Sequence, residues 1–185
     1  MRTSALLLAS AMIIAGCAPT SNDTLEPADA FFERVSALCG KTFEGRLVTE
    51  DPADADFAGE RLVARAGECS DDEVRIAFDV GEEKSRTWII TRTEDGLRLK
   101  HRHMLDDGAE DPVSQYGGDT IAPGTGSRQE FPADAYSKEM FTREGMTVSL
   151  PNVWAFEIEP DEALVYELAR PGRLFRVQFD LSNPV

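Results

Sequence analysis

Residues 85–105 alternate between apolar and polar side chains on both sides of Asp95-Gly96, which is the pattern of a β-hairpin with a two-residue turn. A type I′ turn there fixes the pairs across the hairpin as Glu94 with Leu97, Arg92 with Leu99, Ile90 with His101 and Trp88 with His103. Both histidines, the only two in the chain, therefore share the apolar face with Trp88. The opposite face is polar, so we expect the histidines to point inward.

The same alternation predicts strands elsewhere in the chain. They are Thr42–Thr49, Arg61–Glu68, Glu73–Val80, a short one at Arg128–Phe131, and three that start near Trp154, Leu164 and Phe175. Pro171-Gly172 predicts a turn between the last two strands. That turn places Leu168 opposite Phe175, Tyr166 opposite Val177 and Leu164 opposite Phe179, so that apolar residues face apolar residues.

Helical spacing is found only in two short stretches. Pro27–Leu38 predicts a helix before the first strand. Ala135–Thr142 predicts a second one, capped by Asp134 and with Tyr136 and Met140 on one face. Between the central hairpin and this helix, residues 106–126 are rich in Asp, Gly and Pro, which predicts a long loop.

These elements predict an all-β domain of eight or nine antiparallel strands, with a short N-terminal helix and a short helix after the long loop. Sequential antiparallel strands with one apolar face close into a barrel or stack as a sandwich, and we favour the barrel. The opening helix, the Gly-Lys-Thr-Phe segment at residues 40–43 and the meander resemble calycins, the group of lipocalin-like and fatty-acid-binding barrels. Phe43 stands where the lipocalin Gly-x-Trp motif has its Trp. The chain also resembles uncharacterised secreted proteins of proteobacteria.

The start of the chain predicts export. Residues 1–16 carry one early Arg and a short apolar run, which is typical of a signal peptide and too short to span a bilayer. Ile14-Ala15-Gly16-Cys17 resembles the lipobox of bacterial lipoproteins, which implies cleavage before Cys17 and lipidation of its sulfur. Ala18 follows where Asp would imply retention at the inner membrane, so the resemblance implies an outer-membrane lipoprotein facing the periplasm of a Gram-negative cell. Residues 17–26 would be a flexible tether and 27–185 the single barrel domain.

Charge and cysteine content limit the partners further. The formal net charge of −15 disfavours binding to nucleic acid. Alternatively, the charge has no role other than to keep the domain soluble. With Cys17 lipidated, Cys39 and Cys69 remain as a pair in an oxidising compartment, which predicts a disulfide. A redox-active or metal-binding pair is the alternative, but the Cys-x-x-Cys spacing that usually accompanies it is missing.

The candidate chemistry centres on the two histidines. On one strand face, His101 and His103 would lie about 7 Å apart and could share a metal ion with a third ligand, such as Asp106, Asp107, Glu110 or Asp111. Alternatively, the two histidines contact a ligand or have a purely structural role. If the barrel has a cavity, Trp88 and Tyr166 would line it. Tyr116 follows the histidine strand closely and is either a further ligand contact or loop packing.

Three classes of function follow from these observations. The first is a binding module that holds a small apolar or amphipathic ligand in the barrel. The second is a metal-dependent or acid-base enzyme centred on His101 and His103, and the third is an envelope interaction protein whose barrel is filled. The sequence has no Gly-x-Ser-x-Gly motif, so we assign no catalytic residue and name no cofactor.

Overall fold

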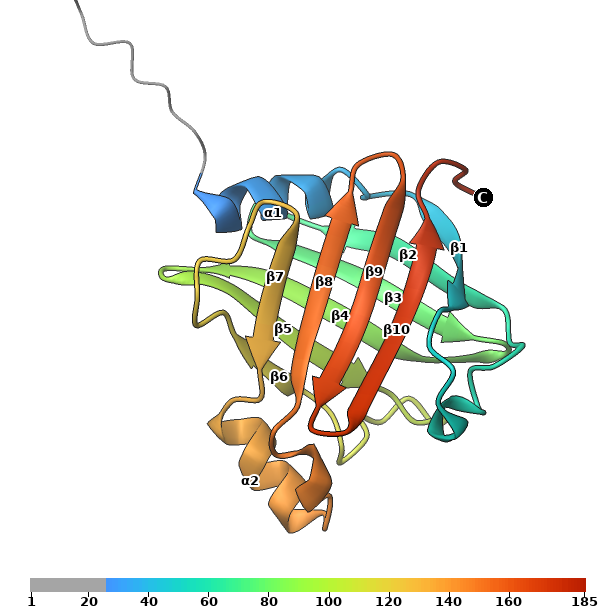
Figure 1. Ribbon diagram of the computed structural model, residues 1–185, viewed down its shortest axis with the longest axis vertical. Coiled ribbons are helices and arrows are strands. Elements are labelled where there is room, and N and C mark those ends of the chain that lie inside the picture. Colours follow the sequence, from blue (N-terminus) through green and yellow to red (C-terminus); the bar gives the residue numbers. More distant parts are fainter. Residues whose placement is uncertain (1–25) are drawn as a thin grey trace, which may run out of the picture.

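A computed structural model describes residues 26–185, which form one antiparallel sheet of ten strands in the order β6-β5-β4-β3-β2-β1-β10-β9-β8-β7. The strands are β1 (Thr42–Leu47), β2 (Leu62–Cys69), β3 (Glu73–Val80), β4 (Glu83–Thr93), β5 (Gly96–His103), β6 (Tyr116–Asp119), β7 (Arg128–Pro132), β8 (Val153–Glu159), β9 (Ala163–Arg170) and β10 (Arg173–Asp180). The sheet curls into a nearly closed barrel, so that its two ends come together (Figure 1). The predicted all-β antiparallel meander is confirmed.

Two α-helices and two short 3₁₀-helices complete the structure: α1 (Pro27–Ser36), α2 (Ala135–Arg143), η1 (Pro52–Asp54) and η2 (Thr147–Ser149). Helix α1 lies across one end of the barrel and α2 lies near the opposite end (Figure 1). Phe31, Phe32 and Val35 of α1 are buried in the core, which explains the helical spacing of apolar residues. In the part of the chain that is described, no helix has the length and apolar character needed to span a bilayer.

The predicted count of eight or nine strands is wrong because β6 lies within the stretch we expected to be a loop. Its sequence, Tyr-Gly-Gly-Asp, has no apolar alternation that could indicate a strand. The glycines are needed for packing, since a Cβ on Gly117 would lie 1.9 Å from the Leu99 carbonyl oxygen. A Cβ on Gly118 would lie 1.9 Å from the carbonyl oxygen of Pro132 in β7. The two glycines therefore let β6 approach β5 on one side and β7 on the other.

The start of α2 joins the open edges of the sheet. The Asp134 N–H donates to the Gly117 carbonyl oxygen at 2.8 Å. The Ser137 hydroxyl accepts from the Gly117 N–H at 2.8 Å and donates to the Gly117 carbonyl oxygen at 2.9 Å. Asp134 also caps α2 as predicted, because its carboxylate accepts from the Ser137 N–H. Of the two residues predicted on one face of α2, Met140 is buried, whereas the Tyr136 side chain is 49% exposed.

The central hairpin has the predicted faces but not the predicted register. Trp88 pairs with His101 and Arg86 with His103, a slip of two residues from the expected pairs. The chain turns at Glu94 and Asp95. Gly96 starts β5 with φ +147°, and a Cβ there would lie 2.4 Å from the Thr120 hydroxyl oxygen. Because side chains alternate with a period of two, a slip of two leaves both histidines on the inner face.

The remaining predictions for the core are confirmed. In the β9–β10 hairpin, Leu168 pairs with Phe175, Tyr166 with Val177 and Leu164 with Phe179, as the Pro171-Gly172 turn predicts. Cys39, just after α1, is bonded to Cys69 at the end of β2. The predicted signal peptide, Cys17 and residues 17–25 of the predicted tether lie outside the described residues.

Candidate functional site

A pocket of about 210 Å³ is lined by Arg170 and Arg173, which flank the β9–β10 turn. This turn lies at the end of the barrel away from α1 (Figure 1). All five side chains predicted to contact a ligand line the pocket: Trp88, His101, His103, Tyr116 and Tyr166. The other lining residues are Phe57, Phe78, Arg86, Thr87, Leu168, Arg170, Arg173 and Phe175. The structure thus brings the predicted residues together from four strands.

His101 belongs to the floor of this pocket and is 3% exposed. Its Nδ1 lies 3.1 Å from the Tyr116 carbonyl oxygen, which can only accept, so Nδ1 carries the proton and donates. Its Nε2 therefore accepts from the Tyr166 hydroxyl at 2.8 Å. Burial lowers the pKa of His101 to about 3, because the charged imidazolium would lose its hydration. The ring is neutral at physiological pH.

His103 forms the second histidine–tyrosine pair. Its Nε2 lies 2.9 Å from the Tyr116 hydroxyl oxygen. Burial, and then the positive charge of Arg86, lower the pKa of His103. Burial also raises the pKa of both Tyr116 and Tyr166, so their hydroxyls stay protonated. The polar groups of the floor are therefore neutral donors and acceptors.

Stacked aromatic rings form the apolar wall. The Trp88 ring contacts both Phe78, with centroids 4.6 Å apart, and Tyr166, with centroids 4.5 Å apart. Tyr116 stacks on His101 at 4.5 Å. These side chains hold one another in place, so the pocket presents a flat, apolar and largely preformed surface.

Three arginines at the pocket were not among the predicted residues: Arg86, Arg170 and Arg173. Arg173 forms an ion pair with Asp54, which is 1% exposed, and the Arg170 guanidinium donates to the side-chain oxygen of Asn152 at 3.2 Å. Arg86 could have been found from the sequence, because it precedes Trp88 by two residues and thus belongs to the inward face. The same rule finds the other two, because Arg170 follows Leu168 by two residues and Arg173 precedes Phe175 by two.

In the part of the chain that is described, no third side chain completes a metal site with the two histidines. Nε2 of each ring already pairs with a tyrosine hydroxyl. Glu110, a candidate third ligand, accepts instead from Ser114 and Gln115. Among residues 26–185 there is no group of three or more His, Cys, Asp or Glu side chains that could hold a metal ion. Hydrogen bonding therefore accounts for these histidines without a metal.

A larger hollow of about 680 Å³ lies between the start of α1 and the β4–β5 hairpin. Its charged lining residues are Glu26, Asp29, Arg92, Glu94 and Asp95, and Arg92 is already paired with Asp29. The pocket at the other end is smaller, but it combines stacked aromatic rings with buried polar groups. Such a combination is typical of small-molecule sites, so we take the smaller pocket as the candidate.

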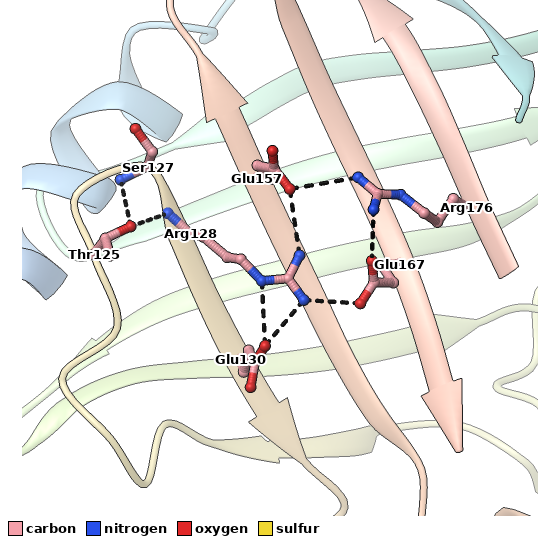
Figure 2. Close-up of polar contacts among 7 residues, drawn as sticks. All are labelled: Thr125, Ser127, Arg128, Glu130, Glu157, Glu167 and Arg176. Atoms are coloured by element: carbon pink, nitrogen blue, oxygen red, sulfur yellow. Dashed lines mark hydrogen bonds and ion pairs between the residues drawn. The ribbon is translucent and has the colours of Figure 1, made fainter. Parts of the chain in front are cut away.

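A separate cluster of charges lies on the outer face of β7–β10 (Figure 2). Arg128 and Arg176 each form ion pairs with both Glu157 and Glu167, at nitrogen–oxygen distances of 2.8–3.4 Å. The Glu167 side chain is 10% exposed. These ion pairs join four neighbouring strands, and each charged side chain has a partner of opposite charge. We therefore assign the cluster a role in stabilising the sheet.

Comparison of the chain with protein-family models, with curated proteins and with solved structures found no match.

Proposed function

We propose that this chain is a lipid-anchored protein of the cell envelope whose barrel binds a small apolar or amphipathic ligand. The observation that carries the binding proposal is the pocket in which Trp88, His101, His103, Tyr116 and Tyr166 meet. An aromatic wall supplies the hydrophobic driving force, and the neutral hydroxyl and imidazole groups supply hydrogen bonds that orient a ligand.

The pocket favours a binding module over a protein with a filled barrel. An interaction protein with a filled barrel has no need of a recess lined by stacked aromatic rings and buried polar groups. The volume of about 210 Å³ is several times the roughly 30 Å³ that one water occupies in the liquid. Enzymatic chemistry has less support, because His101 is neutral and both of its ring nitrogens are engaged in hydrogen bonds.

A steric plug tests the binding proposal. Leu168 lines the pocket, whereas Leu174, on the adjacent strand, is 45% exposed and outside it. Binding of 4-fluorobenzyl alcohol and similar single-ring probes can be followed by ¹⁹F NMR, which does not depend on the protein's own tryptophans. We expect saturable binding to the wild type and to Leu174→Trp, and at least tenfold weaker binding to Leu168→Trp. Equal binding to both variants, or no binding to the wild type, would contradict the proposal.

Lipid anchoring rests on the Ile14-Ala15-Gly16-Cys17 motif and has its own test. The full chain and Cys17→Ser can be expressed in a Gram-negative host and the cells fractionated. We expect the wild-type protein in the outer-membrane fraction and the variant outside it. If the variant remained in the membrane fraction to the same extent, the anchor would be disproved while the binding proposal stood.

A further inference from the structure

Arg86 places a positive charge beside the aromatic rings of the pocket, which Arg170 and Arg173 also line. It lies on the inner face of β4, opposite His103, and its Cζ is 5.7 Å from the centroid of the Phe57 ring. The side chain is 28% exposed, so it is largely removed from water. Burial lowers the pKa of Arg86, because the cation loses hydration that its surroundings do not replace.

The counter-ion of Arg86 is a surface residue. Arg86 forms an ion pair with Glu83, whose side chain is 45% exposed at the start of β4. The buried Nη1 of Arg86 is the nitrogen that contacts the Glu83 carboxylate, and this ion pair lacks the geometry of a hydrogen bond. Arg173 differs, because its partner Asp54 is buried and fixed. An exposed carboxylate can move away into water, which leaves Arg86 available to another anion.

The volume of the pocket limits the size of that anion. At about 210 Å³ it is smaller than the roughly 300–1,000 Å³ of sites for drug-sized ligands. An apolar cavity of about 150 Å³ is known to hold benzene. There is therefore room for one ring with a short polar substituent, and too little for a long acyl chain.

We propose that the pocket binds a small aromatic carboxylate, with its ring among the aromatic side chains that line the pocket and its carboxylate on Arg86. This inference rests on the proposed function and adds the chemical class of the ligand. The guanidinium presents parallel N–H donors that match the two oxygens of a carboxylate. The Tyr116 and Tyr166 hydroxyls are further polar groups of the pocket. Because the formal net charge of the chain is −15, a preference for anions would have to come from this local arrangement.

A matched pair of probes separates charge from shape. 4-Fluorophenylacetate and 4-fluorophenylacetamide differ little in size, and ¹⁹F NMR gives the Kd of each. We expect the wild type to bind the acid at least tenfold more tightly than the amide, and Arg86→Gln to lose that preference. Arg61→Gln removes the same charge from an exposed surface pair with Glu44, so it should keep the wild-type preference.

Glu83 supplies a test with the opposite sign. If it competes with the ligand for Arg86, Glu83→Gln should bind the acid severalfold more tightly than the wild type and the amide equally well. Should Arg86→Gln fail to fold, Arg86→Lys is the replacement, and it should reduce the preference without abolishing it. Unchanged affinity for the acid in Glu83→Gln would argue against Arg86 as the anion site.

The outcomes distinguish this inference from the proposed function. Equal affinity of the wild type for acid and amide, with binding still blocked by Leu168→Trp, would overturn the aromatic carboxylate and leave the binding module intact. A preference for the acid that persists in Arg86→Gln would also overturn it, because the carboxylate would then lie elsewhere. Failure of both probes and of the neutral single-ring panel to bind would overturn the inference and the proposed function together.

Discussion

The Tyr166 hydroxyl donates a 2.8 Å hydrogen bond to Nε2 of His101, and this bond joins the two halves of the barrel at the floor of the pocket. Tyr166 comes from β9 and His101 from β5, strands that lie far apart in the order of the sheet. Because the Tyr116 carbonyl fixes the proton on Nδ1, the other ring nitrogen is an acceptor, and Tyr166 satisfies it. The pocket floor therefore depends on a neutral histidine in one defined tautomer.

Removing this hydroxyl should destabilise the protein. Tyr166→Phe leaves Nε2 of a buried ring without its donor, which costs about 1–3 kcal/mol of the free energy of unfolding. Tyr136→Phe is the control, because Tyr136 is 49% exposed and its hydroxyl lies 3.4 Å from the Ser114 carbonyl oxygen. Urea unfolding measures both, and we expect the control to change by less than about 0.5 kcal/mol. A similar decrease in the free energy of unfolding of the two variants would show that the hydrogen bond to His101 contributes no more to stability than an exposed one.

Acidification should destabilise the protein below about pH 6.5, the usual pKa of histidine. The pKa of His101 is about 3 in the folded state, so between these values the unfolded state binds a proton that the folded state does not. Stability is therefore fully present above the unfolded pKa and falls by up to about 1.4 kcal/mol per pH unit as the pH drops. His103, whose pKa burial also lowers, adds to the effect with the same sign.

Replacing His101 tests this assignment. His101→Gln removes the titrating group, so its free energy of unfolding should depend less steeply on pH between pH 6 and pH 5, above the usual range of carboxylates. Urea unfolding at several pH values gives the slope, which does not depend on whether the variant is less stable overall. Parallel slopes for the wild type and the variant would contradict a neutral, buried His101.

Ser137 should be needed to hold the edge of the barrel. Its hydroxyl is buried and bonds to both the N–H and the carbonyl of Gly117, and Ser137→Ala leaves the Gly117 N–H without this acceptor at a cost of about 1–3 kcal/mol, while the carbonyl keeps the Asp134 N–H. Thr142→Ala is the matched control on the same helix, because Thr142 bonds only the Lys138 carbonyl on the exposed side. Hydrogen exchange at the amide of Gly117 should accelerate in the first variant. An unchanged exchange rate would show that α2 does not hold the edge strands β6 and β7 together.

The disulfide should contribute substantially to stability. Cys39 and Cys69 are 30 residues apart, and a crosslink over such a loop is worth about 3 kcal/mol. In a Cys17→Ser background, the unreduced protein should react with no alkylating agent before reduction and with two equivalents after it. Reduction should then lower the free energy of unfolding by about that amount. Two reactive thiols before reduction would exclude the bond in the mature protein.

Much of the fold could be predicted from the sequence because alternation records which face of a strand is buried. The β9–β10 register follows from Pro171-Gly172 and from apolar pairs that agree with it. Alternation cannot detect a slip of two residues, because such a slip leaves every side chain on the same face. The sequence therefore predicted Ile90 opposite His101, whereas the structure has Trp88 there. It also cannot detect β6, whose glycines are selected by the close approach of Leu99 and Pro132 and not by burial of side chains.

The candidate site was only partly visible for a related reason. Trp88, His101 and His103 lie on one hairpin, so the alternation of side chains along its strands was enough to predict that they share a face. Phe57 reaches the pocket from a loop, and its position depends on how the barrel closes, whereas Arg170 ends β9 and Arg173 begins β10, both on the inward face. Closure at β6 and β7 is a long-range packing event, and no short sequence pattern encodes it.

The position of a bound ring is the most direct test of the binding proposal. A structure of the protein with 4-fluorophenylacetate, or intermolecular NOEs from its ring protons, would locate the probe. We predict the ring among the aromatic side chains that line the pocket of about 210 Å³. A ring found instead in the larger hollow between α1 and the β4–β5 hairpin, or no bound ring at concentrations that saturate the ¹⁹F signal, would contradict it.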